Sequence, residues 1–455
     1  MKLVEFTPKP LDDYEVLIDD WMLDELRRTA EGLRGVRLLH VSSTALGGGV
    51  AEILQSMVPF LNQLGLAAEW KILTADEAFY RVTKRLHNGL QGAPQQLTPG
   101  DYGHYLTAVA ANAKELEGEY DVAVVHDPQP AALLESGRMH ADHWIWRCHL
   151  DTSAPDPEVW SFVRSLLMSY DAAIFTLAEY VPKDLPIKRV ELIPPAIDPL
   201  RSKNLSLPSL LTRRTLQKYG VNPDLPLVTQ VSRFDHWKDP LGVYKAYKRA
   251  RQHFPDLQLA LIGSSATDDP EGSEVLEAVS RATRGDDQTF VLTNLSDAEV
   301  GAFQVRSDLV LQKSLREGFG LVVAEAAWKG TAVIGSAVGG IPLQLGDEGM
   351  VVGERDDFAE AIIALLQDKG RARDIAAKVQ ERVRKHFLMP RLALTFLHLL
   401  TQRLRGDRKG SLARDPMCGL YLEPGSDQAF CSERCRAKFK NKEAGVALEA
   451  EGDRT

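Results

Sequence analysis

Short apolar runs alternate with longer amphipathic segments along most of this chain of 455 residues. An apolar run bounded by turn residues is typical of a buried strand. Segment 157–170, in contrast, has apolar residues at helical spacing and a proline near its start, where a missing N–H costs nothing. The alternation predicts an α/β protein with parallel sheets and helical crossovers. Strands are expected at 36–41, 121–126, 143–150, 172–176, 225–231, 257–265, 289–293 and 308–314.

The length exceeds what one hydrophobic core of ordinary size accommodates, so two large domains are expected. Segment 199–214 clusters Pro, Ser and Asn without periodicity, which places the linker there. We therefore expect one α/β domain at 1–205 and a second at 206–389. The charged segment that begins at residue 406 marks another boundary, beyond which a small cysteine-containing tail occupies 411–445.

The net charge of −9 argues against a nucleic-acid partner, because the phosphate backbone selects basic surfaces. An anionic ligand would then need a local cationic pocket. No segment approaches the roughly 20 consecutive apolar residues of a membrane helix, and the N-terminus is acidic without an apolar signal core. We expect a cytoplasmic protein with no membrane partner.

Two loops suit an anion. The glycine run 47–49 follows the first expected strand and lets backbone N–H groups approach an anion at the next helix start, although a tight turn is an equally simple explanation. Arg233 and Lys238 lie five residues apart in a loop that leads into another helix. Two cations beside a helix start suit a diphosphate, whereas the alternative is a pair of solvated surface charges.

Two further strand ends carry polar groups that suit a sugar. Glu317 and Glu325 are eight residues apart in a Gly-rich loop and the helix after it. Glu317 is placed to accept hydrogen bonds from hydroxyls, and Glu325 to hold a ribose unless it is an exposed helix carboxylate. His149 and Asp151 emerge at the end of an apolar strand, where polar groups of such sheets face a cleft; a structural histidine is the alternative.

Together these motifs resemble the retaining glycosyltransferases of family 4, whose GT-B fold sets two Rossmann-like domains facing across a cleft. The resemblance covers roughly residues 36–405 and is carried by the Glu-x7-Glu pair, the SRFDHWKDP loop and the GGGVAE segment. It implies an N-terminal acceptor domain, a C-terminal nucleotide-sugar donor domain, and a final helix at 390–405 that returns to the first domain. More narrowly, segments 82–92, 124–130 and 146–151 are similar to those of the trehalose glycosyltransferring synthases.

The resemblance also implies a role for individual residues. Arg233 and Lys238 would grip the donor diphosphate, and Glu325 would hold the ribose. Glu317 would bind the transferred glucose, and His149 would approach it near the reaction centre. These residues other than Glu325 form the expected catalytic set. Further donor-binding residues would be Gly48, Gly49, Gly318, Phe319, Gly320, Leu321 and Val322. Acceptor-binding residues would be Asp151, Asp127, Gln129, His87, Asn88 and Gln91, for which ordinary loop packing is the alternative.

The implied reaction transfers glucose from a nucleotide-activated donor, such as ADP-glucose or UDP-glucose, to free glucose and forms trehalose with retention of configuration. The leaving diphosphate can itself accept the acceptor's proton, so no dedicated base is needed. Approach of the two domains would exclude water. Mg²⁺ would accompany the nucleotide without a protein-ligated ion, since Asp268 and Asp269 suit a polar turn. We also expect a homodimer.

Two other functions stay open at this point. Retaining trehalose phosphorylases share part of the pattern and use glucose 1-phosphate, so a ribose-holding Glu325 would have no task in one. A noncatalytic nucleotide-sugar or metal sensor could use the same scaffold, with the cysteine tail as its reporting module.

The tail resembles small metal-associated modules of the YHS and TRASH type, through its DPMCG and FCSERC segments. Cys418, Cys431 and Cys435 are candidate zinc ligands, and Asp415 is a candidate for the fourth position of a tetrahedral site. A reduced, metal-free tail is the alternative. The motifs of glycosyl transfer are complete before this segment begins, so we expect it to take no part in that reaction.

Overall fold

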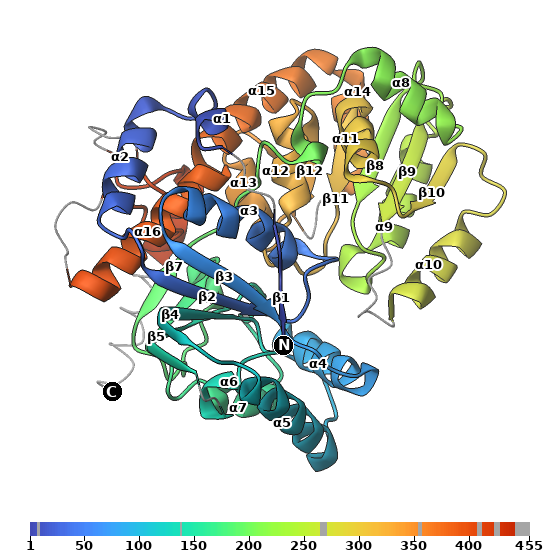
Figure 1. The fold of residues 1–455 in the computed structure, drawn as a ribbon. Coiled ribbons are helices and arrows are strands. Elements are labelled where there is room, and N and C mark those ends of the chain that lie inside the picture. The colour runs from blue at the N-terminus through green and yellow to red at the C-terminus, as the bar shows by residue number, and fades with distance from the viewer. Residues whose placement is uncertain are drawn as a thin grey trace, which may run out of the picture.

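The computed structural model describes residues 1–6, 10–136, 139–263, 271–353, 357–406, 412–422 and 428–441. Within these residues the strands form two sheets, one of seven strands and one of six, and helices cover both faces of each (Figure 1). The first sheet belongs to the N-terminal half of the chain and the second to the C-terminal half. This arrangement confirms the predicted α/β class.

The first sheet has the order β1-β3-β2-β4-β5-β6-β7, and all its neighbouring pairs are parallel except β1 and β3. Strands β2 and β4 are neighbours at the centre of this order. The chain moves from β2 outward to β3 on one side and from β4 outward to β5 on the other, which makes a topological switch point between β2 and β4. Open α/β sheets commonly bind ligands at such a point. The strands are β1 (Lys2–Leu3), β2 (Arg37–Ser42), β3 (Ala67–Ile72), β4 (Glu119–His126), β5 (His140–Arg147), β6 (Ala172–Phe175) and β7 (Val190–Leu192).

Both faces of the first sheet are buried under helices. Adjacent residues of a strand point to opposite sides of the sheet, so they enter different cores. Leu38, for example, packs with α2, α3 and α16, whereas Leu39 packs with α4, α5 and α7. The helices of this half are α1 (Asp12–Glu15), α2 (Asp20–Glu31), α3 (Gly49–Gln63), α4 (Glu77–Leu90), α5 (Pro99–Lys114), α6 (Leu133–Ser136) and α7 (Pro157–Leu166), with the short η1 (Ala178–Tyr180).

The second sheet is parallel throughout and has the order β10-β9-β8-β11-β12-β13. Its switch point lies between β8 and β11. The strands are β8 (Leu227–Val231), β9 (Gln258–Gly263), β10 (Thr289–Thr293), β11 (Leu309–Gln312), β12 (Ala332–Ser336) and β13 (Met350–Val352). The helices are α8 (Ser209–Lys218), η3 (His236–Lys238), α9 (Pro240–Ala250), α10 (Glu271–Ala282), α11 (Asp297–Arg306), α12 (Leu321–Trp328), α13 (Ile341–Leu345), α14 (Phe358–Gln367) and α15 (Lys369–His386).

The chain crosses between the two halves at two adjacent places. Ile197 donates its N–H to the Phe387 carbonyl (2.9 Å), and its own carbonyl accepts the N–H of Met389 (2.8 Å). Helix α16 (Met389–Arg405) then packs against α2 and α3 of the first half. The two crossings therefore form one paired strip of backbone between the sheets.

Segment 199–214, predicted to be an irregular linker, is not irregular throughout. It contains the short helix η2 (Ser202–Asn204) and the start of α8, so the prediction is wrong from Ser209 onward. The helix forms because Thr212 and Leu216 lie four residues apart and bury the same face, which packs on α11. The polar composition of the segment reflects the other, exposed face of this helix.

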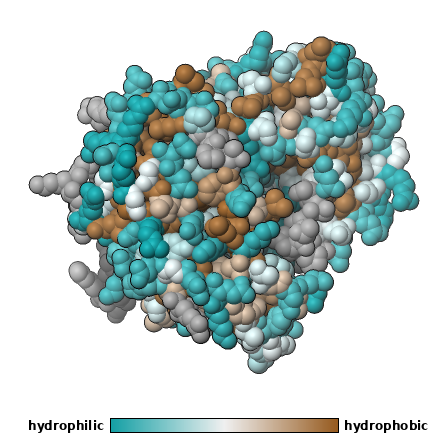
Figure 2. All heavy atoms as spheres, in the orientation of Figure 1, coloured by the Kyte–Doolittle hydropathy of each residue, from teal (hydrophilic) through white to brown (hydrophobic). Residues whose placement is uncertain are grey.

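The face of the molecule in Figure 2 is covered largely by hydrophilic residues, with hydrophobic ones gathered in separate patches. Among the helices of the described residues, none combines the length and the apolar character that crossing a bilayer requires.

Candidate active site

A cavity of about 580 Å³ lies between the two halves, at the strand ends that flank both switch points. Its wall combines the glycine-rich loop after β2 and the ends of β4 and β5 with the loops after β8 and β11. A cavity of this size suits a small organic ligand. Every residue of the expected donor site lines it, namely Gly48, Gly49, Arg233, Lys238, Glu317, Gly318, Phe319, Gly320, Leu321, Val322 and Glu325.

The glycine-rich loop brings the start of helix α3 to the cavity. Gly47 has a φ of 77°, a conformation that glycine adopts without strain, and the helix begins two residues later at Gly49. The first N–H groups of a helix have no partner within it and form a ready site for an anion. A Cβ on Gly49 would lie 3.4 Å from Leu321 Cδ1. The helix start therefore faces the loop that precedes α12 in the second half.

The loop after β8 presents Arg233 and Lys238 to the same space. Asp235 organises this loop: its carboxylate accepts hydrogen bonds from Arg233 Nη2 (3.2 Å) and from the Trp237 N–H (2.9 Å). Lys84 of helix α4 approaches the same carboxylate from the first half, at 3.9 Å. Burial opposes ionisation of Asp235, but Arg233 and Lys84 hold its pKa below the usual range. The arrangement gathers three cations at one end of the cavity.

Glu317 is held in place by three hydrogen bonds, one of which comes from Lys238. Its Oε2 accepts hydrogen bonds from Lys238 Nζ (2.5 Å), Gln312 Nε2 (3.1 Å) and Ser314 Oγ (3.1 Å). Lys238 therefore lies against a carboxylate that fixes the position of its ammonium group. A side chain held in this way loses little conformational freedom when an anion binds beside it.

Glu325 is buried, at 1% exposure, so it is not an exposed helix carboxylate. Its Oε1 lies 2.6 Å from Lys203 Nζ, and its Oε2 accepts a hydrogen bond from Gln304 Nε2 (3.3 Å). The same ammonium of Lys203 also reaches Glu52 of α3, at 2.6 Å. Glu325 thus lines the cavity and also belongs to a network of charged groups that connects the two halves.

Three histidines form a chain from the core to the cavity. His40 Nδ1 lies 3.0 Å from His126 Nε2, and His126 Nδ1 lies 3.0 Å from His149 Nε2. Burial lowers the pKa of each, to about 3 for His40 and well below the usual range for the other two, so all three are neutral.

The chain also fixes which nitrogens carry protons. His40 Nε2 is buried and has no partner among the described residues. A buried unpaired N–H is rarer than an unpaired acceptor, which places the proton on His40 Nδ1 and makes it the donor to His126. His126 then donates to His149 Nε2. The remaining proton of His149 then lies on Nδ1, and His149 is one of the residues that line the cavity.

We expect the neutral His40 to make stability depend on pH. Its pKa is about 3 in the folded chain and 6.5 when unfolded, so below pH 6.5 the unfolded chain takes up a proton that the folded chain refuses. As the pH is lowered below 6.5, the free energy of unfolding of the wild type should therefore decrease. For each pH unit this decrease should exceed that of His40→Gln by about 1 kcal/mol. Urea unfolding between about pH 7.5 and pH 5 measures this difference. Parallel pH profiles for the two proteins would contradict it.

Four of the six expected acceptor residues line the cavity: His87, Gln91, Asp127 and Gln129. Asp127 has a φ of 62° and accepts the His149 N–H at Oδ1 (2.7 Å), while burial raises its pKa to about 7. Asn88 and Asp151 do not belong to the wall. Asp151 instead accepts hydrogen bonds from Ser153 Oγ (2.6 Å) and from Arg316 Nη1 (3.1 Å) of the second half, so its carboxylate joins the two halves outside the cavity lining.

Sequence reasoning missed several polar residues of the wall. Lys84, His126, Asp235, Gln312 and Arg316 all line the cavity. Lys84 had a detectable signal, since it precedes the candidate His87 by three residues, and in the structure the two share a face of helix α4. The role of Gln312 had none, because it is the last residue of a buried strand and its value lies in its contact with Glu317.

The candidate metal ligands of the tail lie outside this cavity. Asp415, Cys418, Cys431 and Cys435 form a cluster of their own. Asp268 and Asp269, expected to form a polar turn, lie outside the described residues, as do residues 411, 423–427 and 442–445 of the predicted tail.

Two protein families match the chain on either side of its crossing. Residues 40–182 match the family described as trehalose synthase, N-terminal domain, and residues 212–384 match glycosyl transferases group 1. The trehalose synthase of Rubrobacter xylanophilus is 42% identical over 405 residues, which cover 87% of this chain and 97% of the relative. That of Pyrococcus horikoshii is 41% identical over 399 residues, covering 86% and 96%. A trehalose phosphorylase of Grifola frondosa is more distant, at 26% identity over 83% of this chain and 58% of the relative.

Solved structures give the fold. The sucrose-phosphate synthase of Thermosynechococcus elongatus superimposes with a TM-score of 0.63 at 20% identity, over 82% of this chain and all of the other. A trehalose-6-phosphate synthase has the same TM-score at 16% identity, over 80% and 99%. The chain therefore belongs to the trehalose synthase family and is a glycosyltransferase of trehalose metabolism with the GT-B fold.

Proposed function

We propose that this enzyme transfers glucose from a nucleoside diphosphate glucose to free glucose and forms α,α-trehalose with retention of configuration. The observation that carries the proposal is one cavity lined by a helix start, by Arg233 and Lys238, and by the buried carboxylate of Glu325. The first three suit a diphosphate, and the carboxylate suits the two hydroxyls of a ribose. A sugar phosphate without a nucleoside would leave that carboxylate with no ligand.

The reaction needs electrostatic stabilisation more than a protein base. The bond between the anomeric carbon and the diphosphate breaks, and the acceptor hydroxyl attacks from the same face. Its proton passes to the departing phosphate oxygen. Arg233 and Lys238 stabilise the negative charge that grows there, and Asp235 and Glu317 hold these two cations in place.

The sugars take the part of the cavity beside these cations, since Glu317 contacts Lys238 directly. Glu317 accepts hydrogen bonds from hydroxyls of the transferred glucose, and the Nδ1–H of His149 donates one near the reaction centre. The acceptor glucose lies against the first half, where His87, Gln91 and Gln129 line the wall. The cations of the site already neutralise the diphosphate, so the reaction needs no metal ion held by the protein. Mg²⁺ accompanies the nucleotide in solution.

The decisive experiment offers the protein ADP-glucose, UDP-glucose or GDP-glucose together with free glucose, and identifies both products. We expect trehalose with α,α linkage by nuclear magnetic resonance and one equivalent of released nucleoside diphosphate. Synthesis from glucose 1-phosphate with release of orthophosphate, and none from nucleotide donors, would instead identify a phosphorylase. Donor binding without either product would identify a sensor.

We expect Glu325→Gln to weaken binding of the nucleoside diphosphate by about 10- to 100-fold, because hydrogen bonds to a charged group are worth about 1.5–3 kcal/mol. Pyrophosphate has no ribose and is the matched control ligand, whose affinity should change little. Calorimetric titration of both ligands measures the difference. Equal weakening of both would show that Glu325 acts only through the charge network of Lys203.

A further inference from the structure

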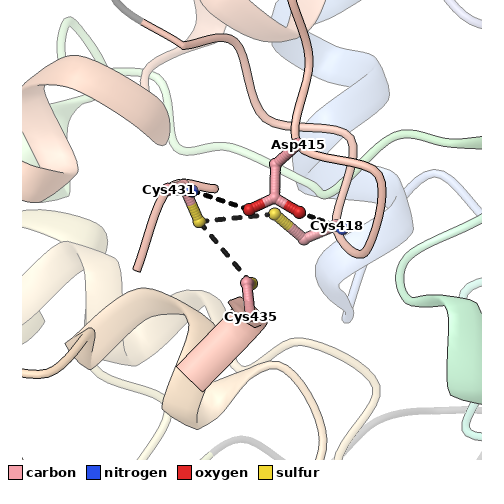
Figure 3. A group of neighbouring side chains, drawn as sticks. All are labelled: Asp415, Cys418, Cys431 and Cys435. Carbon is pink, nitrogen blue, oxygen red and sulfur yellow. Dashed lines mark hydrogen bonds between the residues drawn. The ribbon is translucent and has the colours of Figure 1, made fainter. Parts of the chain in front are cut away.

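The tail gathers four metal-ligating side chains from two short segments, 415–418 and 431–435. One ligand atom from each of Asp415, Cys418, Cys431 and Cys435 lies within 4.8 Å of all the others (Figure 3). The Sγ atoms of Cys418 and Cys431 are 3.5 Å apart, and those of Cys431 and Cys435 are 3.6 Å apart. Zinc–sulfur bonds of ~2.3 Å in a tetrahedral site place neighbouring sulfurs ~3.8 Å apart. The thiols are therefore spaced as ligands of one ion.

The local backbone presents these groups before any ion binds. A tight turn at 415–420 is closed by the Gly419 N–H, which donates to the Asp415 carbonyl (2.8 Å). The Asp415 carboxylate accepts the N–H groups of Met417 (2.7 Å) and Cys431 (2.7 Å), which ties the turn to the second cysteine segment. Cys435 lies in the helical segment 433–441, which begins two residues after Cys431, and its Sγ lies 3.6 Å from that of Cys431.

Burial makes an empty cluster costly. Asp415 and Cys418 are each 1% exposed, and Cys435 is 6% exposed. Among the described residues the Asp415 carboxylate forms no ion pair and accepts hydrogen bonds from backbone N–H groups. Buried charges are normally paired or bound to a metal. Three thiols also cannot all be consumed by one disulfide, whereas one ion uses every one of them.

The cluster lies where the tail touches both halves of the enzyme. Toward the first half, Arg414 donates to the carbonyl of Leu192, the last residue of β7. Toward the second half, Arg382 of α15 donates to the Cys431 carbonyl (3.3 Å) and Sγ (3.5 Å). The Glu433 N–H donates to Asp347, between α13 and β13 (2.7 Å). The two groups of contacts are joined through the four ligands.

We propose that Asp415, Cys418, Cys431 and Cys435 bind one thiophilic divalent cation of the Zn²⁺ type, and that this ion clamps the tail across the two halves of the glycosyltransferase. Binding releases the thiol protons and gives a four-coordinate site with no open position, which is the mark of a structural site. Three thiolates and a carboxylate leave a net charge of about −2 on the zinc site, which the guanidinium of Arg382 partly offsets. The role of the ion is to hold the two cysteine segments together, so that both sets of contacts persist.

The first test is metal analysis of the full chain after purification in the presence of zinc. We expect about one zinc per chain in the wild type and in Cys148→Ser, which removes the cysteine that lies outside the tail, and little in Cys435→Ser. Co²⁺ substitution should give the intense visible bands and the thiolate charge-transfer absorption of a tetrahedral sulfur-rich site. In Asp415→Asn these bands should shift, because an amide is a poorer ligand than a carboxylate. Equal zinc in wild type and Cys435→Ser, or unaltered cobalt bands in Asp415→Asn, would overturn the assignment of ligands.

The second test addresses the clamp. Removal of zinc by a chelator should raise amide hydrogen exchange in segment 430–441 and in the segment around Asp347, and restored zinc should reverse both changes. Asp347→Asn is the matched variant: it should keep its zinc but lose protection at 430–441 by itself. Unchanged exchange after complete zinc removal would reject the clamp, and a tail that oxidises to a disulfide without ever binding metal would reject the site. Neither outcome bears on glycosyl transfer, which is tested with sugars.

Discussion

Replacing Arg233 or Lys238 by alanine is expected to lower kcat by at least about 100-fold, while the chain still folds. Both cations line the cavity, and in the proposed reaction each would stabilise the negative charge that grows on the departing diphosphate. Loss of one preorganised contact of this kind costs about 3–4 kcal/mol. The measurement is steady-state release of nucleoside diphosphate at saturating donor and glucose. Saturation matters because the loss should appear in kcat, as it does when an interaction is made mainly in the transition state.

Lys245→Ala is the matched control. Lys245 is an exposed cation on helix α9, which directly follows the loop that carries Arg233 and Lys238. Its kcat should equal that of the wild type. The conservative exchange Arg233→Lys keeps the charge but loses the two-pronged geometry of the guanidinium, so an intermediate loss is expected. Near-normal kcat in both alanine variants would contradict the proposed catalytic role, whatever their donor affinity.

The sequence could predict much of the cavity wall, because the residues concerned directly follow strands. In a parallel sheet the loops after strands meet at one edge, so the 47–49 run after β2 and Arg233 after β8 are placed by topology alone. Glu317 and Glu325 follow β11 in the same way. Knowing the strands was therefore enough to place these loops at the cavity, although not to name every residue of its wall.

Partners across the two halves could not be predicted in this way. The pairing of Glu325 with Lys203 depends on how one half is seated on the other, and no periodicity records that. Asp151 follows its strand as expected, yet Arg316 draws its carboxylate away from the cavity wall. The histidine chain escaped notice for a different reason. His126 ends β4, His149 lies two residues beyond the end of β5 and His40 lies in the middle of β2, and their sequence separations carry no signal.

Several strands were also missed. Strand β3 reads AAEWKI, in which charged residues interrupt the apolar run, and it is recognised only by its pairing with β2. Strands β7 and β13 have three residues each, too few for any pattern to appear. These strands lie toward the edges of their sheets, where few residues are needed for pairing. The central strands β8 and β11, which position part of the site, have only five and four residues but were recognised because their apolar runs carry no charged residue.

Gly318→Ala should reduce kcat/KM by about 10- to 100-fold without unfolding the enzyme, because it acts on the contact between the halves. A Cβ at this position would lie 2.2 Å from the His149 carbonyl oxygen, so one side must shift. Overpacking of this kind costs about 1–3 kcal/mol, and about 1.4 kcal/mol corresponds to a tenfold change. The Tyr180 hydroxyl, which donates to the Glu317 carbonyl (2.7 Å), holds the same loop against the first half.

A wedge at Gly318 should also admit water to the donor sugar, since closure normally excludes it. The fraction of donor hydrolysed rather than transferred to glucose should therefore rise, which simple loss of donor affinity does not predict. Gly103→Ala is the control, because a Cβ on this exposed helical glycine of α5 meets no neighbouring atom within 4 Å. That variant should match the wild type in kcat/KM. If Gly318→Ala did so as well, with an unchanged hydrolysed fraction, the reacting enzyme would not bring Gly318 and His149 together as they lie here.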